Sequence, residues 1–305
     1  MNSITAPSTV KRSVFALLSG AVDYAGLFPP AGLSMIDAVI NYAAYRNSNY
    51  RWMLGRFIVP ASRLDEFLEC AREFAPRESE NGWRLSVIVA DEITDTIHLI
   101  KNFNSANGPG LLCDAVEIKA DTSGTIENAS ISLPNNVAAY FEIPLDQRMP
   151  DLIATLALTG QSAKIRTGGV TPESFPQTRD IVRFVRTCLA ANVRFKATAG
   201  LHHPIRCFRP LTYEDNSPMG TMHGFLNLFL MTGFAREGYR PSLLADVMED
   251  EFEEVFRFDE QAAIWRDEYV LSTWQLERIR TFGIQSFGSC SFDEPIEDLQ
   301  KLGIL

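Results

Sequence analysis

Short apolar runs alternate with longer amphipathic runs along most of this chain. Eight apolar segments have the length of strands, and apolar residues recur at three- and four-residue spacing between most of them, as in helices that bury one face. The predicted strands occupy residues 14–23, 55–61, 84–91, 114–120, 138–144, 162–169, 193–200 and 282–292. The predicted helices occupy residues 33–46, 61–75, 92–103, 145–160 and 171–192. Because such alternation requires crossover connections, it predicts a parallel sheet.

The number and order of these units set the fold class. Eight of them in 305 residues favour a single α/β domain, residues 1–305, with the architecture of a (β/α)8 TIM barrel. A doubly wound open sheet would give a similar pattern and stays open as the alternative. Residues 207–281 separate the last two strands and include apolar, helix-like runs at 222–235 and 272–282. A segment of this length is not expected to be structureless, so we expect the seventh helix and a helical insertion that serves as a lid or as a contact in a homo-oligomer.

Composition excludes several classes of partner. The formal net charge is −10 and no basic run occurs, which argues against a nucleic-acid or anionic-membrane partner. No apolar run reaches the ~20 residues that span a bilayer. The five cysteines are scattered and lack metal-ligand spacing, as expected of free thiols in a cytoplasmic protein. Residues 11–21 have the basic and apolar parts of a signal peptide, but a first core strand explains them better.

Polar residues repeat one arrangement in four of the predicted strands. Residues two apart in a strand share a face, and the pairs are Glu117 with Lys119, Tyr140 with Glu142, Lys164 with Arg166, and Lys196 with Thr198. The residues between them are mostly apolar and suit the face beneath the outer helices, so we expect the polar pairs to converge on one cavity at the carboxyl ends of the strands. Four cations against two carboxylates predict a positive pocket for a small anionic substrate. The alternative is a structural network in which Glu117 pairs with Lys119, or Glu142 with Lys196.

Four short segments resemble one enzyme family. "AKIRTGG" at 163–169, followed by "VRFKATAGL" at 193–201, resembles the strand-six and strand-seven signatures of deoxyribose-phosphate aldolases and related class I aldolases. "AVDYAGLFPPAGLSMIDAVINYAAY" is similar to the first strand and helix of that family, and "FGIQSFGSCSF" to its last phosphate loop. The resemblance implies a Schiff-base lysine at Lys164, a neighbouring cation at Lys196, and a phosphate side formed by Gly200, Gly288, Ser289 and Ser291. The chain departs from the family at Arg166 and Ala199, where a serine and a glycine are usual.

The residue types suit this chemistry. A second cation favours the neutral, nucleophilic form of a lysine, so Lys196 is expected to activate Lys164. Glu142 is placed to move the α-proton of an imine, and Arg166 to bind a carboxylate or phosphate with two hydrogen bonds. We therefore expect a Schiff-base aldolase or lyase that acts on a small keto acid or sugar phosphate without a cofactor. Further substrate contacts are expected from Asp23, Glu117, Lys119, Tyr140, Thr167, Thr198, His202 and His203.

Other functions remain open at this stage. His202 and His203, with His223 and a carboxylate, suggest a metal-dependent lyase or hydrolase, although their spacing is not typical of a metal site. A barrel that only binds a small anion would keep the cations without needing a nucleophile. A phosphate-binding isomerase or transferase would need the terminal glycine-serine loop. Two carboxylates follow that loop, so Ser291 or Asp293 suits the N-cap of a helix equally well.

Overall fold

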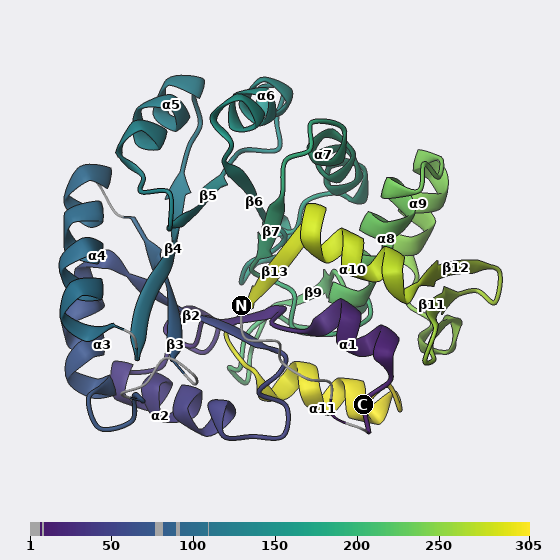
Figure 1. The fold of residues 1–305 in the computed structure, drawn as a ribbon. Coiled ribbons are helices and arrows are strands. Elements are labelled where there is room, and N and C mark those ends of the chain that lie inside the picture. Colours follow the sequence, from purple (N-terminus) through teal and green to yellow (C-terminus); the bar gives the residue numbers. More distant parts are fainter. Residues whose placement is uncertain (1–6, 8, 77–81, 90–91, 109) are drawn as a thin grey trace.

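Eight parallel strands close into a barrel in the computed structural model, which describes residues 7, 9–76, 82–89, 92–108 and 110–305. Every pair of neighbouring barrel strands is parallel, and β13 closes the ring between β1 and β7. The predicted barrel is therefore confirmed and the open sheet excluded (Figure 1). The barrel strands are β1 (Val22–Tyr24), β2 (Leu54–Pro60), β3 (Trp83–Ile88), β4 (Leu111–Lys119), β5 (Ala138–Glu142), β6 (Ser162–Arg166), β7 (Phe195–Thr198) and β13 (Ile284–Ser289).

Helices surround the strands, as Figure 1 shows. Ser34 accepts a hydrogen bond from the backbone N–H of Asp37 and so caps the helix that follows β1, and Thr122 caps the helix after β4, which the sequence pattern did not predict. The third predicted strand extends to 91, but β3 ends at Ile88, and residues 90–91 lie outside the described part. The barrel helices are α2 (Met35–Arg46), α3 (Leu64–Ala71), α4 (Ile93–Asn107), α5 (Ser123–Ser132), α6 (Met149–Thr159), α7 (Thr178–Ala190), α8 (Phe225–Arg236) and α11 (Asp293–Lys301).

The first predicted strand is wrong over most of its length. Residues Arg12–Leu18 form the helix α1, and only Val22–Tyr24 form a strand. Val14, Leu17 and Leu18 are fully buried and recur at helical spacing. They belong to a helix that packs against α10 (Thr273–Phe282). The spacing of the apolar residues, more than their number, determines the structure here.

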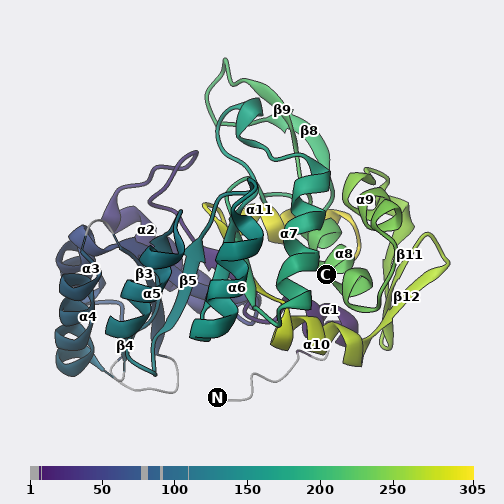
Figure 2. The same cartoon turned by 90° about the horizontal axis from the view of Figure 1, so that it is seen from above.

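The 207–281 segment contains strands as well as the expected helices. It begins with an antiparallel hairpin of β8 (Cys207–Pro210) and β9 (Met219–Met222), which stands out beyond the helices in Figure 2. The helix α8 is the seventh barrel helix, because its Phe225 stacks on Phe287 of β13 with ring centroids 4.8 Å apart. The rest of the segment comprises α9 (Pro241–Glu249), a small antiparallel sheet of β10 (Phe256–Phe258), β11 (Ala262–Trp265) and β12 (Tyr269–Ser272), and α10.

The barrel interior carries charge near the amino ends of its strands. Arg56 of β2 makes a two-point ion pair with Asp114 of β4, with Nε–Oδ1 and Nη2–Oδ2 distances of 2.6 and 3.2 Å. Barrel interiors are usually filled by branched apolar side chains, so this interior is unusually polar from its floor upwards. None of the described helices is long and apolar enough to cross a membrane.

Candidate active site

Six charged side chains form a continuous chain of ion pairs through the barrel. In order they are Asp23, Lys196, Glu117, Lys164, Glu142 and Arg166, and their charges alternate. The five successive N–O distances are 2.5, 2.8, 2.7, 2.8 and 3.1 Å. The chain runs from side chains that are 1% exposed at Asp23 and Lys196 to one that is 52% exposed at Arg166. It therefore connects the barrel interior to the mouth.

Strand register places these groups. Glu142 of β5 lies opposite Lys164 of β6, which lies opposite Lys196 of β7. Because the three are direct neighbours across parallel strands, their side chains share the inner face. The structure thus brings together the polar residues that alternation predicted, but with different partners from the network considered above. Glu117 pairs with both lysines and not with Lys119, and Glu142 pairs with Lys164 and Arg166.

Asp23 and Glu117 hold the buried end of the chain in place. Asp23 accepts hydrogen bonds from Ser286 Oγ at 2.7 Å and from the backbone N–H of Arg56 at 2.8 Å, in addition to its ion pair with Lys196. Glu117 accepts from Ser86 Oγ at 2.8 Å. Sequence reasoning missed both serines, although each occupies an inward position of its strand. Each carboxylate therefore has several donors, which fix the position of the buried end of the ion-pair chain.

The electrostatics of Glu117 and Lys196 follow from this pairing. Burial alone would raise the pKa of Glu117, but Lys196 and Lys164 lower it well below the usual range. Burial would lower the pKa of Lys196, but Asp23 and Glu117 raise it above the usual lysine value. Lys196 therefore stays charged and forms ion pairs with Asp23 and Glu117. Glu117 contacts both lysines, so its negative charge opposes the effect that Lys196 is expected to have on Lys164.

Two carboxylates hold the Lys164 amine. Its Nζ lies 2.7 Å from Glu117 Oε2. The same nitrogen lies 2.8 Å from Glu142 Oε2. Burial would raise the pKa of Glu142, yet the cations of Lys164 and Arg166 lower it. The amine is thus flanked by two carboxylates, of which Glu142 is nearer the mouth.

A cavity of about 420 Å³ opens above Lys164. One wall is apolar, with Phe28, Ile58 and Ile88, and the opposite side carries the charged groups Glu117, Lys164, Arg166 and His202. Three of these four can carry positive charge, so the cavity suits a small anionic molecule. Its remaining lining is formed by Ala25, Pro29, Gly168, Gly169, Val170, Ser174, Thr198, Ala199, Gly288 and Cys290.

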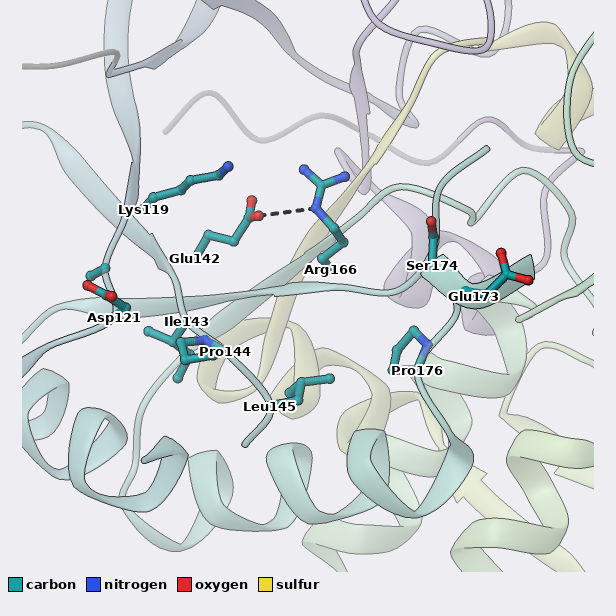
Figure 3. A pocket seen from close by; sticks show the side chains of 11 residues that line it. Lys119, Asp121, Glu142, Ile143, Pro144, Leu145, Arg166, Glu173, Ser174 and Pro176 are labelled. Atoms are coloured by element: carbon teal, nitrogen blue, oxygen red, sulfur yellow. Dashed lines mark hydrogen bonds and ion pairs between the residues drawn. The ribbon is translucent and has the colours of Figure 1, made fainter. Parts of the chain in front are cut away.

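Lys119 belongs to a second cavity, of about 570 Å³, that meets the first at Arg166 and Ser174. Figure 3 shows Lys119, Glu142 and Arg166 pointing toward one another there. The charged residues of this second cavity are two cations, Lys119 and Arg166, and three carboxylates, Asp121, Glu142 and Glu173. The predicted polar residues therefore do not all face one cavity. Tyr140 and Lys196 line neither, and lie below with the ammonium 5.4 Å from the ring centre.

Thr167 and Gly200 shape the cavity through the backbone. The Thr167 hydroxyl donates to the carbonyls of Thr198 and Ala199 at 3.1 and 2.7 Å, so it joins the ends of β6 and β7. Gly200 has φ +74°, and a Cβ there would lie 2.7 Å from a ring carbon of Phe175. This close approach requires glycine. Both residues were expected as substrate contacts, and the structure gives them contacts within the protein.

The predicted phosphate loop has other contacts. Gly288 lines the smaller cavity, but Ser289 and Ser291 line neither cavity. Ser291 Oγ accepts from the backbone N–H of Glu294 at 3.2 Å, so it stabilises the first turn of α11, although the N-cap position itself is Phe292 and not Ser291 or Asp293. Asp293 accepts a hydrogen bond from Tyr45 at 2.7 Å. The polar groups of this loop are therefore used within the protein, at the start of α11.

The histidines do not come together. His202 lines the smaller cavity and contacts Glu294, whereas His203 pairs with Asp298 at 2.6 Å. His223 Nε2–H donates to the carbonyl oxygen of Pro176 at 3.0 Å, and burial lowers the pKa of His223 to about 4. In the described part of the chain no three histidine, cysteine or carboxylate side chains are arranged to hold a metal ion. The metal-dependent alternative therefore lacks a ligand set among these residues.

The site combines an amine, two adjacent carboxylates and a positive cavity at the carboxyl ends of parallel strands, where enzymes of this architecture carry their active sites. Such an arrangement can form an imine and move protons on and off it. Comparison with known proteins adds no assignment: no protein-family model matches this chain, and no curated protein matches it.

Proposed function

We propose that this protein is a class I aldolase or lyase that forms a Schiff base between Lys164 and a small anionic carbonyl compound. The observation that carries the proposal is the position of the Lys164 amine. It lies on the cavity floor, with Glu117 and Glu142 at 2.7 and 2.8 Å. An amine at the reacting position needs a nearby proton acceptor to become a nucleophile, and Glu142 supplies one.

Charge and size define the substrate class. A cavity of about 420 Å³ holds a small molecule. The guanidinium of Arg166 uses Nε for Glu142, which leaves its two terminal nitrogens to bind a carboxylate or phosphate in the two-point manner of arginine. His202 adds a second cation, since hydrogen bonds to Cys290 and Glu294 outweigh burial and raise its pKa to about 9. We infer a keto acid or a phosphorylated sugar.

The proton inventory of the reaction balances within the site. Lys164 gives a proton to Glu142 and attacks the substrate carbonyl, so that a carbinolamine forms. Glu142 returns the proton to the departing hydroxyl, water leaves, and the positive charge of Lys164 reappears on the iminium nitrogen. The iminium then accepts the electron pair of the bond between the α and β carbons as that bond breaks, while Glu142 takes the proton of the β-hydroxyl, so that an aldehyde leaves and an enamine remains on Lys164. Glu142 returns the proton to the α carbon of the enamine, and water hydrolyses the resulting imine, which releases the second product and restores the ammonium of Lys164. Arg166 holds the other oxygen of Glu142 at 3.1 Å throughout, which keeps the acid and base in position.

Borohydride trapping tests the proposal. The parent protein is incubated with pyruvate or glyceraldehyde 3-phosphate and sodium borohydride, and the adduct is measured by intact mass and peptide mapping. We expect a mass increase on Lys164 that Lys164→Met abolishes. Lys119→Met is the matched control, because it removes a cation from the same mouth but lies outside the ion-pair chain, and trapping should persist.

The opposite result is equally informative. If no carbonyl compound gives a borohydride-dependent adduct, and Lys164→Met and Arg166→Met weaken anion binding to the same extent, the proposal fails. The cations would then form a clamp in a barrel that binds a small anion without chemistry. The observation that favours this alternative is the pairing of both lysines with carboxylates, since such pairing keeps an amine charged and not nucleophilic.

A further inference from the structure

A second cluster of titratable groups lies at the barrel mouth, separate from the ion-pair chain. The Cys290 Sγ lies 3.8 Å from His202 Nδ1 and 3.7 Å from the Tyr213 hydroxyl. Glu294 joins both neighbours, at 3.4 Å from His202 Nδ1 and 2.9 Å from the Tyr213 hydroxyl. These side chains come from the end of β13, the loop after β7, the β8–β9 hairpin and the first turn of α11. The loop after β7, the β8–β9 hairpin and the segment 290–294 therefore meet at one thiol.

The thiol faces the cavity that contains Lys164. Cys290 and Gly288 share the inner parity of β13, and both line the cavity of about 420 Å³. The other four cysteines line neither cavity. Cys113 and Cys188 are fully buried in the core, and Cys70 and Cys207 are partly exposed. Burial raises the pKa of all four of these thiols, which keeps them protonated.

The Cys290 sulfur contacts a histidine ring at the mouth of the cavity. His202 is the nearest cation, and its pKa of about 9 keeps it charged at neutral pH. Its contacts with Cys290 and Glu294 both use Nδ1, so among the described residues Nε2 has no hydrogen-bond partner. An imidazolium beside a thiol is the arrangement that activates cysteines. Glu294 is held ionised, because His202 and Tyr213 outweigh its burial and lower its pKa.

The tyrosines around the thiol act as neutral groups. Burial raises the pKa of Tyr213, and it raises the pKa of Tyr24 to about 12, so both stay protonated. Tyr45 of α2 is kept protonated in the same way, and it donates to Asp293. The charged groups nearest the sulfur are therefore the cation of His202 and the carboxylate of Glu294, which contacts His202 and Tyr213.

We propose that Cys290 is a site of reversible oxidation by small hydroperoxides that enter the cavity. The thiolate attacks one peroxide oxygen, so the sulfur–oxygen bond forms while the oxygen–oxygen bond breaks. Sulfur loses two electrons to the peroxide, and the departing hydroxide, or the alkoxide of an organic hydroperoxide, takes a proton from His202 and leaves as water or an alcohol. The products are a neutral sulfenic acid and a neutral imidazole. Two equivalents of an external thiol then return the sulfur to its reduced form as a disulfide of that thiol is made.

Oxidation would change the cavity in two ways. An oxygen atom on Cys290 occupies space beside Gly288, and loss of the His202 proton removes one of the cations of the lining. Both changes weaken the binding of an anion. This consequence rests on the proposed function of the cavity, whereas the oxidation itself depends only on Cys290 and its neighbours. The Lys164→Met variant should therefore still be oxidised.

Competition among the five thiols of one molecule provides the test. The reduced protein is treated with hydrogen peroxide and dimedone, and the labelled peptides are quantified by mass spectrometry. We expect Cys290 to be labelled first, and ahead of Cys70, the matched and partly exposed thiol on α3. His202→Gln should slow labelling of Cys290 about tenfold or more at pH 7, because it removes the cation that stabilises the thiolate, and should leave Cys70 unaffected.

Two results would overturn the proposal. One is labelling of Cys70 or Cys207 ahead of Cys290 in the parent protein. The other is an unchanged labelling rate for Cys290 in His202→Gln, which would remove the imidazolium from the argument. Tyr213→Phe serves as a second variant, since it keeps His202 while removing the hydroxyl that contacts the sulfur, and rapid labelling of Cys290 in it supports the assignment to His202.

Discussion

Glu117 is the residue whose removal should most disturb the barrel. Its side chain is 1% exposed. Among the three carboxylates of the ion-pair chain, it is the one that contacts both Lys164 and Lys196. Glu117→Gln keeps the volume and removes the charge, so Lys164 retains Glu142 and Lys196 retains Asp23, each with one partner in place of two. The ammonium groups would then lie near each other without the anion that separates them.

The magnitude follows from the cost of breaking a buried ion pair, about 3 to 5 kcal/mol. Unfolding entropy of about 2.1 cal/mol/K per residue gives about 0.6 kcal/mol/K for a chain of this length, so the melting temperature should fall by about 5 to 8 °C. The lower end applies if water enters from the cavity above Lys164, because solvent reduces the repulsion between the lysines.

Calorimetry at a fixed scan rate measures the effect. Glu66→Gln is the matched control, because it makes the same substitution in an ion pair with Arg63 on the surface of α3, and its melting temperature should stay close to that of the parent. A Glu117→Gln protein that melts within about 1 °C of the parent would refute the reasoning. The lysines would then have lost their shared anion at no cost, and the ion-pair chain could not be regarded as an energetic unit.

Three further predictions concern the mouth of the barrel. The pKa of His202 rises on folding from 6.5 to about 9, so its charged form stabilises the protein below pH 6.5, and about 3 kcal/mol should be lost as pH rises through 9. Urea unfolding at pH 6.5 and 9.5 should show this difference in the parent and not in His202→Gln, and equal losses in both would contradict it. Gly200→Ala should destabilise by at least about 1 kcal/mol more than Gly160→Ala, since both have positive φ but only a Cβ at Gly200 meets Phe175; equal urea midpoints would exclude the clash. Tyr213→Phe removes the hydrogen bond from the hairpin to α11, so limited proteolysis should cut residues 207–222 faster than in the parent, and an unchanged rate would show that this bond does not restrain the hairpin.

Period-two alternation was sufficient to predict the inner face of the barrel. It identified Glu117, Glu142, Lys164 and Lys196 as residues of one face, because side-chain direction in a strand is fixed by parity alone. It could not predict the pairing. Whether Glu117 contacts Lys119 on its own strand or Lys164 two strands away depends on strand register and barrel closure, neither of which is encoded locally.

Other features depend on contacts between distant segments. Cys290 is unremarkable in the sequence, and its neighbours His202, Tyr213 and Glu294 meet it only when the hairpin and α11 are in place. The helix α1 could have been recognised from the spacing of Val14, Leu17 and Leu18. The small sheet β10–β12 gave no clear pattern, because its strands are three or four residues long and alternation is barely defined at that length.

The closure of the ring by β13 has a consequence for how the chain folds during synthesis. Asp23 emerges early, but its partners Lys196 and Ser286 follow 173 and 263 residues later. Until β13 is made, β1 and β7 each lack a neighbour and present open edges that invite pairing with other chains. Contacts of such long sequence separation form slowly. When β13 is made, it therefore pairs with the open edges of β1 and β7 and brings Ser286 to Asp23. The barrel and its ion-pair network are completed together.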